Sequence, residues 1–388
     1  MNKNSFICRF IDKHKDDWEE ILSTEPYHLK IKRAEGEEYK NLCIFNYFQA
    51  LSDFSIPEVK EARGIIINVK TLEVVCWPFR KFSNFGEPYA DTIDWSTARV
   101  TEKIDGSIMK LWYNKPAEKW ELSSNSIIDA YTSVASPISG CVARANPVFL
   151  GNLFDIAAKQ LDKSALDKDK TYIFELCSPE NTVVVEHSEP KIYHIGTRHN
   201  ITGEESNDDI GIEKPKEYAL NSLEACRAFA DADGPDEYSK DVLKEPIKFE
   251  GLVVNDANYN RIKVKNWKYV AVHYYLTAIS PHDVVEIILE GEADEFLTYF
   301  PQHKETFKFF TERFNKLTEH IQNVMDTAIA EYERLEHNRK AFASFWMSTQ
   351  DKNDIVWGFN ALDGKTLQDV LHYMHYTVNH LTPLLCDP

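Results

Sequence analysis

The sequence predicts an α+β fold, with a β-rich first part followed by an all-helical tail. Short runs of β-branched and aromatic residues recur up to about residue 275, and several alternate apolar with polar side chains. This alternation is typical of half-buried antiparallel strands. Beyond residue 281 the apolar residues repeat every three or four positions, which is the period of a helix. We therefore expect two domains, at residues 1–279 and 280–388.

Eight apolar runs of the first part are expected to form strands. They are GIIINV (64–69), EVVCWPF (73–79), IMKLWY (108–113), YIFEL (172–176), TVVVEH (182–187), KIYHIGT (191–197), EGLVVN (250–255) and RIKVKN (261–266). The residues between the last two, NDANYN (255–260), predict a hairpin turn. Segments 147–165 and 217–231 have helical patterns and are expected to cover a sheet face.

The tail begins with a helix-start signal, Ser-Pro-His-Asp at 280–283. A stripe of apolar residues follows at helical spacing, namely Phe307, Phe310, Phe314, Leu317, Ile321, Val324, Ala328, Tyr332 and Leu335. Residues 281–388 contain 18 acidic and nine basic side chains, a net charge of −9. The tail is therefore expected to be an acidic helical domain with this stripe as its core.

Composition narrows the class of protein. The 388 residues are 43% apolar and 12% aromatic, which suffices for a sizeable core. No apolar run reaches the ~20 residues of a membrane helix, and the first twenty residues lack the apolar stretch of a signal peptide. Seven cysteines are scattered singly, without a Cys-x-x-Cys pair. These features favour a soluble protein of the reducing cytoplasm.

The net charge of −18 argues against a protein that coats nucleic acid through bulk positive charge. It leaves room for a local basic groove. Any interaction with nucleic acid must therefore depend on a particular site, and the search for one begins at a lysine.

Lys103 lies in the stretch Thr-Glu-Lys-Ile-Asp-Gly-Ser at 101–107. A lysine that attacks the α-phosphate of a nucleotide must lose its proton, although its ordinary pKa is ~10.4. It also needs other cations to neutralise the phosphates, and carboxylates to hold a metal or the ribose. A glycine just after the lysine lets the backbone approach the nucleotide. The chain supplies each of these groups.

The cations and carboxylates lie on both sides of Lys103 along the chain. Upstream of Lys103 lie Arg63 and Lys81, and downstream lie Glu175, Glu250, Lys263 and Lys265. The last two lysines are two residues apart on an expected strand, so they point to the same face. Two such lysines repel each other unless an anion lies between them, which indicates an anion-binding site.

This order resembles the covalent nucleotidyltransferases, the polynucleotide ligases and mRNA capping enzymes. Lys-Ile-Asp-Gly, Phe-Glu, Glu-Gly-Leu-Val-Val and Lys-Val-Lys look like their motifs I, III, IV and V. Further pieces resemble the phage-type RNA ligase 1 family, namely IFNY (44–47), EARGI (61–65), PFRKFSN (78–84) and RIKVKNWKYV (261–270). The likeness covers residues from about 40 to 275, and the helical tail is similar to the all-helical end of that family.

The resemblance implies an ATP-dependent RNA ligase that works through a lysyl-AMP, with Mg²⁺ or Mn²⁺ as cofactor. Lys103 would be the nucleophile, and Tyr47 would touch the distal phosphates. The phosphate-binding cations would be Arg63, Lys81, Lys263 and Lys265, with Lys263 or Lys265 nearest the reacting centre. The phage member has a lysine where this chain has Ser124, and an aromatic residue where it has Ser83. These departures put one phosphate contact and one packing contact in doubt.

The same resemblance assigns the remaining site residues. Glu175 would hold the ribose or the hydrated metal, and Glu250 would hold the magnesium shell. Asp105 and Gly106 would shape the lysine loop. Val253 would pack under the adenine, within an adenylyltransferase domain whose active site lies in a groove between antiparallel sheets.

Two other functions remain open from the sequence. One is a nucleotidyltransferase with another substrate, which seals DNA or caps RNA with GMP. The helical tail weighs against it, because those enzymes are expected to carry a β-barrel after motif V. The other is an RNA-binding relative without chemistry, which would have no need of Lys103, Glu250 and the two lysines of motif V. The expected partner is RNA with a 5′-phosphate and a 3′-hydroxyl, such as cut tRNA in RNA repair, and no membrane.

Overall fold

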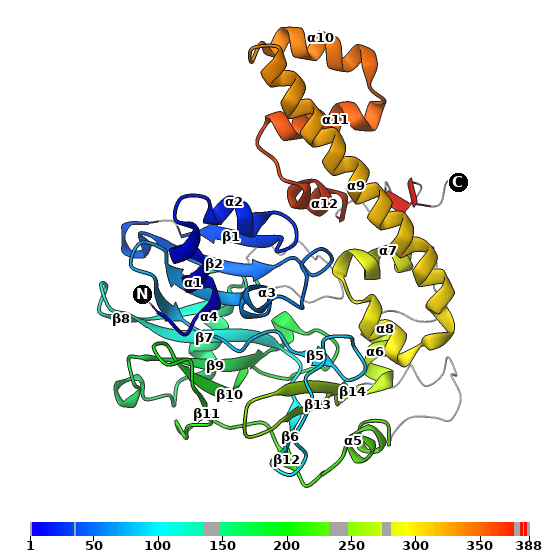
Figure 1. The fold of residues 1–388 in the computed structure, drawn as a ribbon. Helices are drawn as coiled ribbons and strands as arrows, with labels where there is room; N and C mark the ends of the chain where they lie inside the picture. The colour runs from blue at the N-terminus through cyan, green and yellow to red at the C-terminus, as the bar shows by residue number, and fades with distance from the viewer. Residues whose placement is uncertain are drawn as a thin grey trace. The chain divides into compact units, whose positions relative to one another are not determined.

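The computed structural model describes residues 2–34, 36–135, 148–232, 247–273, 281–375, 381–382 and 384–385 (Figure 1). The chain divides into two compact units, Met1–Thr277 and Ala278–Pro388. The first is built on three β-sheets and the second on helices. The α+β fold expected from the sequence is confirmed.

The first sheet is antiparallel, with strand order β1-β2-β3-β4. Its strands are β1 (Leu29–Arg33), β2 (Leu42–Tyr47), β3 (Arg63–Asn68) and β4 (Glu73–Cys76). The helices α1 (Phe6–His14), α2 (Trp18–Ser23) and α3 (Pro57–Glu61) accompany it, with the short helix η1 (Glu37–Tyr39). Ile7, Leu22, Phe45 and Ile65 are buried together, so these helices pack on one face of the sheet. No strand or helix was predicted from the sequence before residue 64.

The second sheet is also antiparallel, with strand order β11-β10-β9-β7-β8. Its strands are β7 (Ser107–Asn114), β8 (Lys119–Ser124), β9 (Lys170–Cys177), β10 (Lys191–His199) and β11 (Glu205–Ser206). It is accompanied by α4 (Leu150–Ala157), η2 (Ala130–Thr132), η3 (Lys163–Ala165) and η4 (Pro179–Asn181). Phe154 of α4 packs against Phe174 of β9 on one face. Trp112 of β7 packs against Ile44 and Ile66 of the first sheet on the other.

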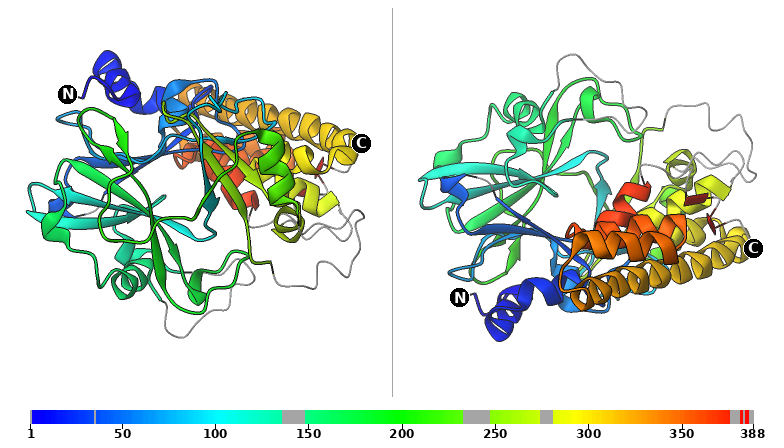
Figure 2. Two further views of the ribbon diagram at one scale, coloured as in Figure 1. Left: turned by 90° about the horizontal axis from the view of Figure 1, so that it is seen from below. Right: turned by 90° about the horizontal axis from the view of Figure 1, so that it is seen from above.

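The third sheet has the strand order β12-β6-β13-β14-β5. Its strands are β5 (Ser83–Asn84), β6 (Arg99–Lys103), β12 (Glu217–Tyr218), β13 (Gly251–Asn255) and β14 (Arg261–Lys265). All neighbours are antiparallel except β14 and β5. The helix α5 (Leu223–Ala230) covers one face with Cys226 and Ala230, and α6 (Trp267–His273) follows β14. Figure 2 shows the ribbon from two further directions.

Three expected elements differ in the structure. The run TVVVEH (182–187) is a loop and not a strand, because its amides bind a carboxylate, as described below. The helix expected over 147–165 is only α4 followed by the single turn η3. The segment 217–231 begins with the strand β12 before α5.

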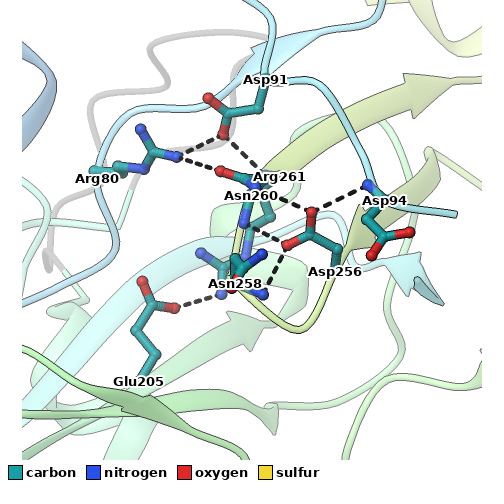
Figure 3. Close-up of polar contacts among 8 residues, drawn as sticks. All are labelled: Arg80, Asp91, Asp94, Glu205, Asp256, Asn258, Asn260 and Arg261. Atoms are coloured by element: carbon teal, nitrogen blue, oxygen red, sulfur yellow. Dashed lines mark hydrogen bonds and ion pairs between the residues drawn. The ribbon is translucent and has the colours of Figure 1, made fainter. Parts of the chain in front are cut away.

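The hairpin of β13 and β14 is held by the buried carboxylate of Asp256 (Figure 3). Oδ1 accepts hydrogen bonds from the amides of Asn258 and Asn260, at 2.9 and 3.0 Å. Oδ2 accepts from the Asp94 amide at 3.1 Å and from Asn260 Nδ2 at 3.0 Å. Burial alone would raise the pKa of Asp256, but these hydrogen bonds lower it below its ordinary value. This carboxylate joins the turn to the chain before β6, and so fixes the strands that carry Lys103, Lys263 and Lys265.

Arg261, at the start of β14, connects the second and third sheets. Its guanidinium forms an ion pair with Glu205 of β11 at 2.5 Å, and both side chains are buried. It also stacks over the ring of Phe79 at 4.1 Å. Arg80 forms a second ion pair with Asp91 at 2.9 Å, and Asp91 accepts from the Arg261 amide (Figure 3). The two sheets are thus held at a fixed separation beside the hairpin.

The second unit is helical throughout the described residues. It contains α7 (Pro281–Glu290), α8 (Ala293–Tyr299), η6 (Pro301–His303), α9 (Lys304–Arg334), α10 (Arg339–Thr349), α11 (Lys352–Leu362) and α12 (Leu367–His375). The expected stripe of α9 is buried at Phe307, Phe310 and Phe314. No helix in the described part of the chain is long and apolar enough to cross a bilayer.

We predict that Asp256→Ala lowers the free energy of unfolding by about 2 kcal/mol, because it leaves several amide groups without an acceptor. Urea denaturation of both proteins measures this loss. Asp94→Ala is the matched control, since it keeps the backbone amide that binds Asp256. An equal loss in the two variants would contradict the role given to Asp256.

Candidate active site

Lys103 is the last residue of β6, in the middle strands of the third sheet. Cα pairing places it opposite Gly251 of β13, which in turn lies opposite Lys265 of β14. Two residues along the same strands, Thr101, Val253 and Lys263 form a second row. Because side chains alternate along a strand, both rows point to the same face. This face carries the lysines that the sequence singled out.

A buried carboxylate lies between the two lysines of the first row. Lys103 Nζ is 2.6 Å from Glu250 Oε1, and Lys265 Nζ is 3.8 Å from the same oxygen. Glu250 is only 4% exposed. Burial raises its pKa, although the two ammonium groups act in the opposite direction. Its second oxygen, Oε2, has no hydrogen-bond partner in the described part of the structure.

Glu175 of β9 approaches this cluster from the second sheet. Removal of its carboxylate from water raises its pKa to about 8, although Lys103 acts in the opposite direction. The pKa of Glu175 in the free protein therefore lies well above that of an ordinary glutamate. Binding of a cation or of hydroxyl groups near it would favour the ionised form.

The loop after Lys103 is fixed through Asp105, which is buried. Asp105 Oδ2 accepts from the amides of Val184 and Val185, at 2.9 and 2.7 Å. Its Oδ1 accepts from the hydroxyl of Tyr269 at 2.8 Å. A Cβ on Gly106 would lie 2.4 Å from the carbonyl oxygen of Leu176, so only glycine fits there. Asp105 and Gly106 hold the turn that ends β6.

A cavity lies between the second and third sheets, beside Lys103. It is lined from β6, β13 and β14 on one side and from β7, β9 and β10 on the other. Five of the residues expected from the sequence line it, namely Arg63, Lys103, Glu175, Val253 and Lys263. The aromatic ring of Phe82 lies 5.1 Å from the Arg63 guanidinium and 5.6 Å from Lys263 Nζ. The cavity therefore combines cations, a carboxylate and apolar walls.

Two expected phosphate contacts, Tyr47 and Lys81, lie against each other. Lys81 Nζ donates to Gln49 Oε1 at 3.2 Å. It also lies 5.3 Å from the ring of Tyr47 and 5.1 Å from that of Phe54. Neither Tyr47 nor Lys81 lines the cavity beside Lys103. Glu250, Lys265, Asp105 and Gly106 do not line it either, but they adjoin Lys103 through the contacts above.

Several residues that hold this site were not predicted from the sequence. The hydroxyl of Tyr269 donates a hydrogen bond to Asp105, but an aromatic residue at the start of a helix gives no signal of such a contact. The amides of Val184 and Val185 come from an apolar run that predicted a strand. Ile104, Ile108 and Ile195 line the cavity, and their residue type is indistinguishable from ordinary core.

Comparisons with known proteins agree on one family. A family model described as RNA ligase matches residues 61–270. A putative bifunctional polynucleotide kinase/RNA ligase of Autographa californica nuclear polyhedrosis virus is 29% identical over 322 residues, covering 78% of this chain and 43% of the viral protein. The RNA ligase of Rhodothermus phage RM378 is 26% identical over 400 residues, covering 86% and 88%. This chain therefore spans less than half the length of the viral relative and most of the phage one.

A search of solved structures found an archaeal ATP-dependent RNA ligase with 11% sequence identity and a TM-score of 0.40. The match covers 69% of this chain and 64% of the archaeal one. That TM-score is too low to support an argument from structure. Family membership therefore rests on the family model, which matches residues 61–270, more than half of the chain.

We predict that Glu175→Gln removes a pH dependence of stability. The folded-state pKa of about 8 lies above the ~4.3 of an unfolded glutamate, so the folded state keeps a proton that the unfolded state has lost. The contribution of Glu175 to stability is therefore complete below pH ~4.3 and lost as the pH rises toward 8. The wild type should lose up to about 1.4 kcal/mol per pH unit relative to the variant.

Chemical denaturation without nucleotide at pH 5.5, 6.5 and 7.5 measures this difference. Glu37→Gln, at an exposed carboxylate, is the control. Parallel stability curves for the wild type and Glu175→Gln would show that Glu175 is ionised throughout.

Proposed function

This chain belongs to the RNA ligase family, and from that membership we propose that it is an ATP-dependent RNA ligase. Its substrates would be RNA ends with a 5′-phosphate and a 3′-hydroxyl. The observation that carries the proposal is Lys103, held 2.6 Å from buried Glu250 at the edge of a cavity that Arg63 and Lys263 also line. A lysine in an apolar wall with flanking cations is suited to attack a polyphosphate.

In the first step Lys103 Nζ attacks the α-phosphate of ATP. A phosphorus–nitrogen bond forms, the bond to the β-phosphate oxygen breaks, and pyrophosphate leaves. The attacking amine must first lose a proton, and Glu250 is the carboxylate in contact with it. Arg63 and Lys263 would neutralise charge on the phosphates in the transition state. Val253, in the row beside Lys103, would pack against the adenine.

The residues present also fit a divalent metal. Glu250 Oε2 is buried and lacks a hydrogen-bond partner among the described residues. Carboxylate oxygens are the ligands that Mg²⁺ and Mn²⁺ prefer. Glu250 would hold the metal with its hydration shell, and Glu175 would hold either a metal-bound water or the ribose hydroxyls. The metal would supply further neutralisation of the triphosphate.

The later steps use the same lysine as leaving group and the same cations. An oxygen of the RNA 5′-phosphate attacks the lysyl-AMP, so the phosphorus–nitrogen bond breaks and AMP moves to the RNA. The 3′-hydroxyl of the other end then attacks the 5′-phosphate and releases AMP. Splitting the reaction in this way replaces one difficult step with easier ones. Lys265, 3.8 Å from Glu250, is placed to stabilise Glu250 throughout.

The alternatives are less well supported. A DNA ligase or capping enzyme would be expected to have a β-barrel after motif V, whereas helices follow β14 here. A binding protein without chemistry would not require Lys103 and Glu250 to be in contact. We place the activity in the cytoplasm, which suits the five buried unpaired cysteines of the described residues.

We predict that Lys103→Ala abolishes joining of a 5′-phosphorylated RNA and also formation of the adenylylated RNA. Gel analysis of end-labelled RNA with ATP and Mg²⁺ measures both products. Lys168→Ala, which removes a lysine outside the cavity, is the control and should behave as the wild type. Joining by the Lys103→Ala protein would show that another group is the nucleophile.

The helical unit is proposed to select structured substrates such as cut tRNA, through few residues because it is acidic. Deletion of residues 281–388 is expected to leave adenylylation of the protein intact. It should impair sealing of broken tRNA more than sealing of a short linear RNA. Initial rates on both substrates measure the effect, and equal losses on the two would refute this role.

A further inference from the structure

Lys110, in the middle of β7, is a fully buried lysine without a carboxylate partner in the described part of the structure. Its Nζ donates to the carbonyl oxygen of Gly64 at 2.5 Å. Opposite it in the sheet lie Ser123 of β8 and Ile173 of β9, neither of which carries charge. Burying an ammonium without a counter-charge is unfavourable. Because burial of the Lys110 ammonium is unfavourable, we infer a function for its charge or for its hydrogen bond.

The accepting carbonyl belongs to a bulge in β3. The pairing of β2 and β3 shifts between Phe45 and Asn46, and the residue passed over is Gly64. Gly64 has φ of +78°, and a Cβ there would lie 2.7 Å from Lys110 Nζ and closer still to the carbonyl oxygen of Asn125. The bulge is therefore enclosed on both sides. Bulges of this kind re-aim a neighbouring side chain.

The side chain that this bulge aims is Arg63. It lines the cavity beside Lys103, and its guanidinium lies over the ring of Phe82 at 5.1 Å. Within the described residues no carboxylate is in ion-pair contact with Arg63. On β7, Lys110 points to the same face as Ile108, which also lines the cavity. Lys110 itself is fully buried and does not line the cavity.

We propose that Lys110 is a positioning residue for the adenylylation step, which clamps the Gly64 carbonyl and so directs Arg63 toward the phosphates of ATP. This inference rests on the proposed function. Burial, with a smaller contribution from the charge of Arg63, lowers the pKa of Lys110 to about 8. Cys76 of β4 is the other titratable side chain that acts on it.

A double-mutant cycle tests the proposal. Lys110→Met keeps the length of the side chain and removes the donor, and Arg63→Ala removes the group that is positioned. Adduct formation is followed by intact mass over a range of ATP concentrations, which separates KM for ATP from the maximal rate. Lys110→Met should raise KM for ATP about tenfold when Arg63 is present, and by less than about twofold when Arg63 is alanine, as expected for coupled neighbours.

Asn200→Ala is the matched control. Asn200 is buried and its Nδ2 donates to the carbonyl of Val75 at 3.0 Å, but it does not line the cavity. This variant should lose thermal stability without a change in KM for ATP. If Lys110→Met does not fold, Lys110→Gln is measured in the same cycle, with the same expectation.

Each outcome decides the proposal. An equal rise in KM in both backgrounds, or no rise in either, would overturn it, and loss of the Lys110 effect in Arg63→Ala would support it. A wild-type protein that forms no adduct would instead overturn the proposed function. If the wild type forms the adduct and Lys110→Met has the same KM for ATP as the wild type, only this inference would be overturned.

Discussion

The contact of Lys103 with buried Glu250 is the interaction on which the rest of the site depends. Glu250 is 4% exposed and holds two ammonium groups, those of Lys103 and Lys265. Removing the carboxylate would take this buried counter-charge away from both ammonium groups in an environment of low dielectric constant, which is costly. The pairing of β6, β13 and β14 brings the three residues together. The hairpin clamp of Asp256 and the ion pair of Arg261 with Glu205 then fix those strands relative to the second sheet.

The site is thus built on rigid strands and supported by buried polar contacts from elsewhere. Asp105 holds the end of β6 through two amides of a distant loop and the hydroxyl of Tyr269. Lys110 holds the bulge of β3 through a hydrogen bond to the Gly64 carbonyl. In each case a charged side chain is removed from water and satisfied by groups on another element. Such supports reduce the motion of groups that must act on a nucleotide.

Much of the fold could be predicted from the sequence, because strands carry a local period, whereas the expected site residues were assigned from the resemblance of the motifs. Lys263 and Lys265 were placed on one face by their spacing alone, and the structure has them on one strand. The same local pattern wrongly predicted a strand at 182–187, because valines favour strands. The amides of two of these valines instead bind Asp105, and no local pattern reveals a partner 79 residues away. Lys110 gave no signal either, since a single lysine in a strand is ordinarily exposed. Lys81 lies against Tyr47 and Phe54, a placement that depends on how the first sheet packs.

The most direct measurement is the intact mass of the purified protein after incubation with ATP and Mg²⁺, without RNA, followed by peptide mapping. Any AMP already bound is first removed, and GTP is run in parallel. A gain of one AMP on Lys103 is the result expected from the geometry of Lys103, Glu250 and the adjoining cavity. A GMP adduct alone would make the protein a capping-type enzyme. No adduct with either nucleotide would contradict covalent catalysis by this chain.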